Sequence, residues 1–141
     1  MPYKLKGRRK EVTLYSLEFS TRYLPCFNEL YDLFYNKKVK IIPNNIYELL
    51  TPIALSLWIM GDDAKLNKGL ILCTDSFTIQ EVITLMNVLK IKYDIDSTIQ
   101  GIQNQRPRIY ILPKSMPKLI NIVKPYFLPS MLYKLNLNFY Y

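Results

Sequence analysis

The chain contains no histidine, and this absence removes several kinds of chemistry. Without imidazole there is no Ser-His-Asp triad, no histidine acid–base catalysis and no ligand set for most zinc sites. Cysteine is nearly as scarce: Cys26 and Cys73 lie far apart and form no C-x-x-C pair, which predicts free thiols in a reducing compartment, Cys73 in a buried strand. The sequence also lacks the long apolar runs typical of membrane spans and secretory leaders.

Positive charge and a large hydrophobic fraction are what the chain does have. Its 141 residues include 19 Lys and Arg against 11 Asp and Glu, a formal charge of +8, and 50% of the residues are hydrophobic. The length predicts one domain with its own core. A basic, folded, aromatic-rich chain most often binds a polyanion, although the same excess also occurs as ordinary charge that keeps a surface soluble.

The rest of the chain is organised around one stretch, residues 50–65, which reads LTPIALSLWIMGDDAK. Thr51 as N-cap and Pro52 at the first helical position predict a helix start. The uncharged run that follows predicts a helix buried on nearly every side. It ends in Gly61-Asp62-Asp63, and carboxylates are unfavourable at the C-terminal end of a helix dipole. A divalent cation would compensate them, and small residues in the helix would let a second helix approach and share it.

These residues resemble the LAGLIDADG homing endonucleases in their degenerate, mitochondrial intron-encoded form, with residues 55–63 as the signature. The resemblance continues through residues 40–45, 74–78, 108–111 and 123–135, which are similar in order and spacing to the second repeat of the two-repeat, omega-type subfamily. It implies an α+β fold: an αββαββα unit with a concave basic antiparallel sheet at residues 49–135, preceded by a strand–helix remnant of a truncated first repeat at 12–48. Residues 1–11 are then a basic arm, and 136–141 a C-terminal tail.

The resemblance also implies a catalytic centre that hydrolyses DNA phosphodiesters with Mg²⁺. Asp62 matches the acidic metal ligand, with the carbonyl of Gly61 as a further oxygen ligand. Lys40 and Lys134 match the lysines that lie near the cleaved phosphates in the two repeats. Asp63 replaces the final glycine of the signature, where an added carboxylate would crowd the metal or repel a second helix.

Local patterns predict the remaining elements. A strand is expected at 13–21 and a helix at 26–35, with Phe27, Leu30, Tyr31 and Phe34 on a core-facing side. Thr78 and Glu81 form a capping box for a helix to about residue 93. Further expectations are a hairpin of residues 94–100 and 105–112 around Gly101, a helix at 114–124 and a helical turn at 130–135. The core-facing residues expected on the 78–93 helix are Ile79, Val82, Ile83, Met86 and Leu89.

The hairpin alternates an apolar and a polar face, and we expect the polar face to bind nucleic acid. Arginine and glutamine can make bidentate contacts with guanine and adenine in the major groove. Each of these side chains could instead contact phosphate or solvent, and for the lysines that is the better explanation. The candidate nucleic-acid-binding residues are Lys65, Lys68, Thr98, Gln100, Arg106, Arg108, Tyr110 and Lys114.

The sequence holds one signature helix where the family pairs two. We therefore expect a partner over the signature helix, at Pro52, Ser56, Trp58 and Ile59: a self-copy, a separately encoded half or a protein–RNA assembly. Three hypotheses follow: a half endonuclease completed by a partner, a cleavage-silent descendant that binds structured RNA as an intron maturase or organellar ribosome component, or a structural module with incidental charge. Abundant Ile, Asn, Lys and Tyr, with the family, predict an organelle-encoded mitochondrial protein.

Overall fold

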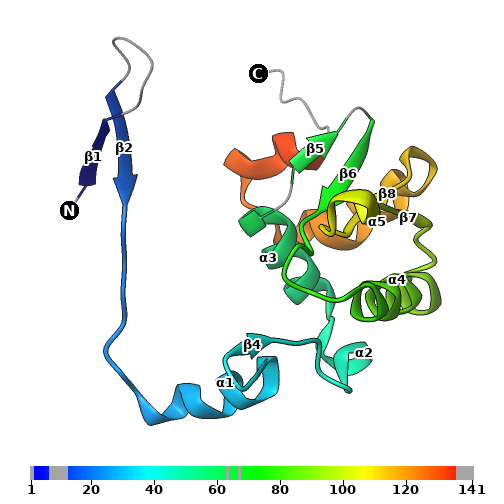
Figure 1. Ribbon diagram of the computed structural model, residues 1–141. Coiled ribbons are helices and arrows are strands. Elements are labelled where there is room, and N and C mark those ends of the chain that lie inside the picture. The colour runs from blue at the N-terminus through cyan, green and yellow to red at the C-terminus, as the bar shows by residue number, and fades with distance from the viewer. Residues whose placement is uncertain (1, 7–12, 63, 67, 136–141) are drawn as a thin grey trace. The chain divides into compact units, whose positions relative to one another are not determined.

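The computed structural model describes residues 2–6, 13–62, 64–66 and 68–135. The chain divides into two compact units, Met1–Asp32 and Leu33–Tyr141, and each is described by itself (Figure 1). In the described part of the chain, no helix is both long and apolar enough to cross a membrane. The expected tail at 136–141 and most of the expected arm at 1–11 lie outside the described residues.

The first unit is a hairpin followed by most of a helix, and its residues 17–32 are all exposed. Strand β1 (Pro2–Lys6) pairs antiparallel with β2 (Thr13–Leu17), so part of the predicted basic arm is a strand, and the predicted strand at 13–21 ends four residues early. A 3₁₀ turn, η1 (Pro25–Phe27), leads into α1 (Asn28–Phe34). The prediction that this helix buries an apolar face is wrong: Phe27, Leu30 and Tyr31 are 43%, 53% and 46% exposed.

The second unit opens with a very short hairpin and a helical turn. Strands β3 (Tyr35–Asn36) and β4 (Val39–Lys40) pair antiparallel around a two-residue turn, in which Lys37 and Lys38 both have positive φ, 47° and 66°. Helix α2 (Ile46–Leu49) follows. Residues 33–48 belong to the second unit, so the expected division of the chain at residue 48 is not a boundary between units; as a boundary between ancestral repeats it stays a prediction.

The signature helix forms where the sequence predicted it. Helix α3 spans Pro52–Asp62, and the N–H of Ala54 donates to Oγ1 of Thr51 over 3.2 Å, which is the expected N-cap. Inward, Leu55 and Ile59 are fully buried. Outward, Leu57 is 62% exposed, so the helix is buried on one side and not on nearly every side.

A four-stranded antiparallel sheet forms the centre of the second unit. Its strands are β5 (Ala64–Leu66), β6 (Gly69–Leu72), β7 (Ser97–Gln100) and β8 (Arg108–Ile111), in the order β5-β6-β8-β7. The 3₁₀ turn η2 (Ile102–Asn104) links β7 to β8 after Gly101. The φ of Gly101 is +76°, and a Cβ added there would lie 2.3 Å from the carbonyl oxygen of Arg106. Glycine is required there.

Helices cover the apolar face of this sheet (Figure 1). They are α4 (Ile79–Tyr93), which carries the predicted capping box, and α5 (Met116–Val123), flanked by the 3₁₀ turns η3 (Pro113–Ser115), η4 (Lys124–Tyr126) and η5 (Pro129–Leu135). The element order from α3 to α5 is αββαββα, and the predicted α+β fold is confirmed. The core combines both sheet and helix positions: Leu55, Ile59, Leu70, Leu72, Val82, Leu85, Leu89, Ile109, Ile111 and Leu119.

Candidate nucleic-acid interface

One face of the sheet is polar, as the strand alternation predicted. The register places Thr98 opposite Tyr110 and Gln100 opposite Arg108, so these side chains share a face. Thr98, Gln100 and Arg106 are exposed, whereas Tyr110 is half-buried. A Cβ at Gly69 would lie 2.6 Å from ring atoms of Tyr110, so the tyrosine ring lies directly over this glycine. The backbone of β6 can therefore support a flat ring on the polar face.

Arg108 is held by a carboxylate that the sequence reasoning missed. Its Nε and Nη2 donate to the two carboxylate oxygens of Asp75 over 2.7 and 2.8 Å. This bidentate pair, helped by the charge of Arg106, lowers the pKa of the Asp75 carboxyl below its usual value. Asp75 lies just beyond β6 in the loop that leads to α4. Only the β6–β8 pairing brings that loop to Arg108, so local sequence carried no signal for it.

Lys114, the last residue of the predicted interface, is placed differently from the arginines. Nζ of Lys114 lies 3.0 Å from Asp96, within an ion cluster that includes Lys90 and Asp94. This cluster lies where β8 ends and β7 begins, whereas Arg106 lies at the other end of the same hairpin. Lys114 therefore pairs with a carboxylate away from the arginines, and its contact with nucleic acid stays a prediction.

The turn between β5 and β6 contributes one clear candidate. Lys68 is exposed, as expected. Lys65 lies in β5, where it pairs with Leu70 of β6, and its contact with nucleic acid stays a prediction.

The end of the signature helix has a lysine bound to it. Asp62 is the last residue of α3, and Gly61 is exposed. Nζ of Lys134, from η5, donates to the carbonyl oxygen of Met60 over 2.6 Å. A cation bonded to the last carbonyls of a helix offsets the negative end of its dipole. The structure thus brings Lys134 to the helix end that carries Asp62, two of the residues matched to the catalytic centre.

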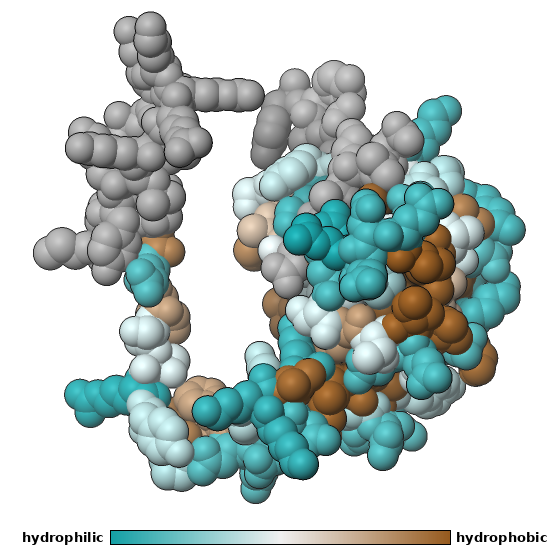
Figure 2. All heavy atoms as spheres, in the orientation of Figure 1, coloured by the Kyte–Doolittle hydropathy of each residue, from teal (hydrophilic) through white to brown (hydrophobic). Residues whose placement is uncertain are grey.

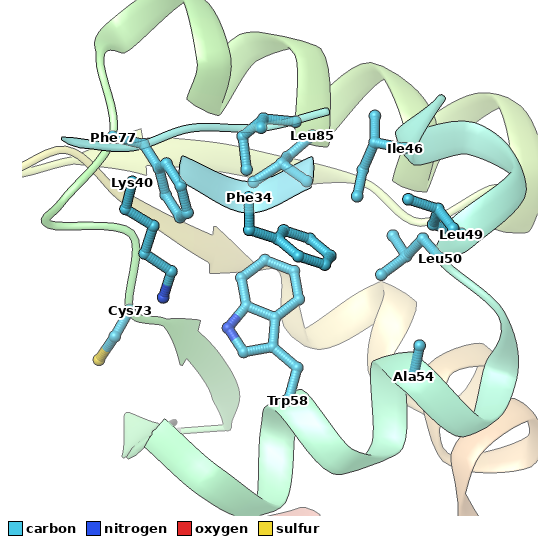
Figure 3. A pocket seen from close by; sticks show the side chains of 11 residues that line it. Phe34, Lys40, Ile46, Leu49, Leu50, Ala54, Trp58, Cys73, Phe77 and Leu85 are labelled. Atoms are coloured by element: carbon cyan, nitrogen blue, oxygen red, sulfur yellow. The ribbon is translucent and has the colours of Figure 1, made fainter. Parts of the chain in front are cut away.

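Lys40 lies elsewhere along the same helix. Its ammonium group is 5.4 Å from the ring centroid of Phe77, and its side chain lines a cavity that Trp58 also lines, near the middle of α3. Figure 3 shows Lys40 reaching toward the indole of Trp58. No described contact joins Lys40 to Met60 or Lys134. Its proximity to a cleaved phosphate stays a prediction.

The exposed stripe of α3 differs from the one predicted. Ser56 and Ile59 are fully buried within the chain, and Oγ of Ser56 donates to the carbonyl oxygen of Ile53 over 2.7 Å. The outward positions are Ile53, 51% exposed, Leu57, 62% exposed, and Gly61, which recur every four residues. A Cβ at Gly61 would meet nothing within 4 Å. We call these three residues the outer stripe; it replaces Ser56, Trp58 and Ile59 as the free face, with Pro52 half-buried beside it.

The described residues of one chain do not form a complete metal site. No cluster of three or more His, Cys, Asp or Glu occurs among them. The metal-binding residues expected from the sequence, Asp62 and the carbonyl of Gly61, amount to one carboxylate and one neutral oxygen at one helix end. Since hard divalent cations prefer several oxygen ligands, the described residues alone do not fit a resident Mg²⁺, and further ligands would have to come from outside them.

The fold and this site define a class of protein: a helix ending in a carboxylate, above a sheet with one polar face, is the architecture of a homing-endonuclease unit. The LAGLIDADG DNA endonuclease family matches residues 1–119. The chain also superposes on the homing endonuclease I-WcaI bound to its DNA recognition sequence, with a TM-score of 0.79 and 30% identity, covering 99% of this chain and 64% of that one.

The chain belongs to the LAGLIDADG DNA endonuclease family. It is 45% identical over 121 residues to the cytochrome b mRNA maturase bI2 of Debaryomyces hansenii, a match that covers 84% of this chain and 46% of that protein. It is 39% identical over 122 residues to the intron-encoded endonuclease ai4 of Dictyostelium discoideum, covering 85% and 77%. The chain thus spans less than half of the maturase it resembles.

Proposed function

We propose that the chain acts as one half of a LAGLIDADG endonuclease. It would supply one signature helix, with the Asp62 carboxylate at its end, and one polar sheet that binds duplex DNA; a partner would supply the second helix. The observation that carries this proposal is the outer stripe, because large apolar side chains at Ile53 and Leu57 face solvent along the same helix that presents Asp62. The partner would be a second copy, a separately encoded half or a covalently attached repeat.

The polar face would contact the duplex through a few side chains. Arg106 and Gln100 are exposed and able to contact base edges in the major groove, whereas Arg108 is already oriented by Asp75 and would offer its remaining N–H groups. Lys68 and Thr98 would contact phosphates. The structure of I-WcaI bound to its DNA recognition sequence, which superposes on almost the whole chain, supports duplex DNA as the ligand.

Lys134 would act next to the metal-binding carboxylate. Its ammonium group has three N–H donors, and the bond to Met60 uses one of them. The other two would be available to a phosphate oxygen placed beside Asp62, where positive charge stabilises the negative charge that develops on hydrolysis. Lys40 is proposed for the corresponding role on the other strand. LAGLIDADG endonucleases are in general dependent on divalent metal, and a second carboxylate from the partner helix would complete the ligand set.

The test measures cutting and assembly in one preparation. Purified protein is incubated with intron-free genomic DNA from its source organelle and Mg²⁺, and double-strand ends are mapped by sequencing. We expect cuts at one site, lost in Asp62→Asn and retained in Asp32→Asn, which removes an equivalent charge from an exposed residue of the first unit. Cuts that persist in Asp62→Asn would place the chemistry elsewhere, and absence of cuts under conditions that give tight DNA binding would rule out a self-copy as the partner.

Binding of structured RNA is the alternative, and two relatives favour it. The cytochrome b mRNA maturases bI2 of Debaryomyces hansenii and Saccharomyces cerevisiae are 45% and 40% identical to this chain. Their names also support the proposal of a mitochondrial, intron-encoded origin. Under this alternative the protein would bind its host intron RNA tightly without cutting DNA. RNA binding would be indifferent to Asp62→Asn and weakened in the double variant Arg106→Ala, Arg108→Ala.

A further inference from the structure

A cavity of about 260 Å³ lies in the second unit, away from the polar sheet face. It is bounded by the last residue of α1, by β4, α2, α3 and α4, and by the loop between β6 and α4, and all of its lining residues belong to the second unit. Most of the lining is hydrocarbon. We call it the aromatic cavity because Phe34, Trp58 and Phe77 contribute three rings to its wall.

The rings are arranged so that a flat molecule could lie against them. Figure 3 shows the ring of Phe34 above that of Trp58, with Phe77 on the side toward Lys40. None of the three rings is fully buried. An aromatic ring offers a face on which another flat ring stacks with little dependence on its identity. Filling this space with a ring would therefore extend contacts that the empty cavity leaves unmade.

A cation stands at the edge of the same cavity. Lys40 is exposed, and its ammonium group lies over the ring of Phe77 at 5.4 Å from the centroid. None of the ion pairs among the described residues involves Lys40. An occupant that matches the site would combine a flat, largely apolar body with an anionic group a few ångströms away.

The turn beside the cavity adds further positive charge in an unusual conformation. Lys37 and Lys38 are exposed, and both have positive φ, in a two-residue turn where Asn-Gly is the favoured sequence. Side chains other than glycine, asparagine or aspartate pay a steric cost there. Such strain is often associated with function. Here it places two more ammonium groups on the hairpin that carries Lys40, which suits an occupant with several phosphates in a row.

We propose that the aromatic cavity binds one unpaired nucleobase, stacked on Trp58, while Lys40 and the Lys37-Lys38 turn bind its phosphate and those of its neighbours. A single-stranded nucleic acid has the required flat body and regularly spaced negative charge, whereas the bases of an intact duplex are already stacked. The site goes beyond the proposed function, which assigns duplex binding to the polar sheet face and cleavage to the end of α3; Lys40 is the residue that both proposals use.

The chain has a built-in reporter, since Trp58 is its one tryptophan. Its emission is titrated with a ten-nucleotide oligoribonucleotide of mixed sequence, the matching oligodeoxyribonucleotide and an abasic strand of the same length, while binding is followed separately by anisotropy of an end label. We expect about twofold or greater quenching at saturation with at least one of the base-bearing strands. The abasic strand should bind through its phosphates and leave the emission unchanged.

Two variants separate stacking from phosphate contact. Ala54→Met fills the cavity from α3 and should abolish the quenching while anisotropy still reports binding. Lys40→Gln should weaken binding about fivefold to tenfold, whereas the matched control Lys124→Gln, an exposed lysine outside the cavity, should leave the quenching amplitude unchanged. If Ala54→Met fails to fold, the comparison of base-bearing with abasic strands still decides.

Three results would overturn the proposal. The first is equal quenching by the abasic strand, and the second is unchanged emission at saturation with both base-bearing strands. The third is that laurate reverses the quenching at concentrations that leave the strand bound, which would show that the cavity binds apolar anions instead of a base. Duplex binding is measured in the same samples. If Arg106→Ala loses duplex binding but keeps the quenching of Trp58, the change affects the sheet alone. If duplex binding is intact and the quenching is absent, the proposal for the cavity fails and the proposed function stands.

Discussion

Asp75 determines how the arginines of the polar face are presented. It binds Arg108 in a bidentate pair while its own side chain is 36% exposed, so its negative charge also faces an approaching polyanion. Asp75→Asn removes that charge and frees Arg108. We expect duplex affinity to rise about threefold to tenfold at low salt. The slope of log affinity against log salt concentration should steepen by the amount of about one further phosphate contact. Sequence discrimination should fall because the guanidinium is no longer oriented.

Anisotropy titrations across a salt series check this prediction. Glu48→Gln is the matched control, since it removes one exposed carboxylate from α2. A similar gain in affinity from Glu48→Gln would mean that only net charge matters. An unchanged or weaker affinity in Asp75→Asn would mean that the oriented arginine, and not its free charge, is what the duplex contacts.

The bond between Lys134 and Met60 also makes a prediction about stability. Lys134→Met keeps the aliphatic stem but removes the charged donor from the carbonyl at the end of α3. We expect the free energy of unfolding to fall by about 1–2 kcal/mol, the usual range for losing a hydrogen bond to a charged group at a helix end. Urea unfolding measures it. Lys124→Met, at an exposed position, should cost less than about 0.5 kcal/mol, and equal costs would show that the bond contributes nothing.

At the scale of elements, a charge cluster fixes the C-terminal end of α4 to the start of β7. Lys90 pairs with Asp94 and Asp96 at 2.8 Å each, and Lys118 also contacts Asp94. Hydrogen bonds from Lys118 and then Lys90 lower the pKa of Asp94 to about 2. Asp94 also ends the helix with φ of 53°, so the cluster holds a left-handed C-cap in place.

A lowered carboxyl pKa gives the pH dependence a definite sign. Asp94 binds protons more weakly in the folded chain than in the unfolded one, so its contribution to stability is present above pH 3.8 and lost as pH falls toward 2. We expect the thermal midpoint of the wild type to drop over this interval, and Asp94→Asn to drop less. Salt should reduce the difference because the groups are exposed. Parallel curves for both proteins would exclude Asp94 as a source of the acid loss.

The sequence predicted elements better than it predicted their faces. Capping signals located α3 and α4 to within a residue, and alternation located the buried side of β7 and β8. On α4 the predicted Ile79 and Ile83 are each 43% exposed, while Leu85 and Val88 are buried instead. A helix with apolar residues around most of its circumference has no single stripe for periodicity to find. Figure 2 shows patches of apolar side chains among hydrophilic ones on the surface of the second unit.

The same limit explains the error on the signature helix. Apolar residues surround α3, so the pattern alone could not say that Ser56 and Ile59 face the chain's own core and Ile53 and Leu57 face outward. Small size suggested a helix contact for Ser56, but its hydroxyl bonds within the helix and its side is covered by the same unit. Packing against α5 and the 3₁₀ turns decides this, and those contacts are distant in sequence.

At the scale of the whole molecule, exposed apolar surface is distributed over both units. In the first unit Leu17, Phe19 and Tyr23 are 85%, 86% and 87% exposed. Periodicity identifies a side that can be buried; it does not identify what buries it. Surface of this kind on a chain that spans less than half of its maturase relative is expected to be covered in an assembly.

Gly61 gives the sharpest test of that assembly. A Cβ there would contact nothing within 4 Å, so Gly61→Ala should leave the isolated chain folded and stabilise it by up to about 1 kcal/mol through helix propensity. In a close helix pair the same methyl group would hold the two backbones apart. We therefore expect Gly61→Ala to raise the thermal midpoint of the monomer and to weaken association about tenfold or more in sedimentation velocity.

Leu57→Asp should abolish association without unfolding the chain, because Leu57 is 62% exposed. The control Ile91→Asp, at a 73% exposed position on α4, should leave association intact. Association that survives both α3 substitutions and fails in Ile91→Asp would move the partner surface from the signature helix to α4.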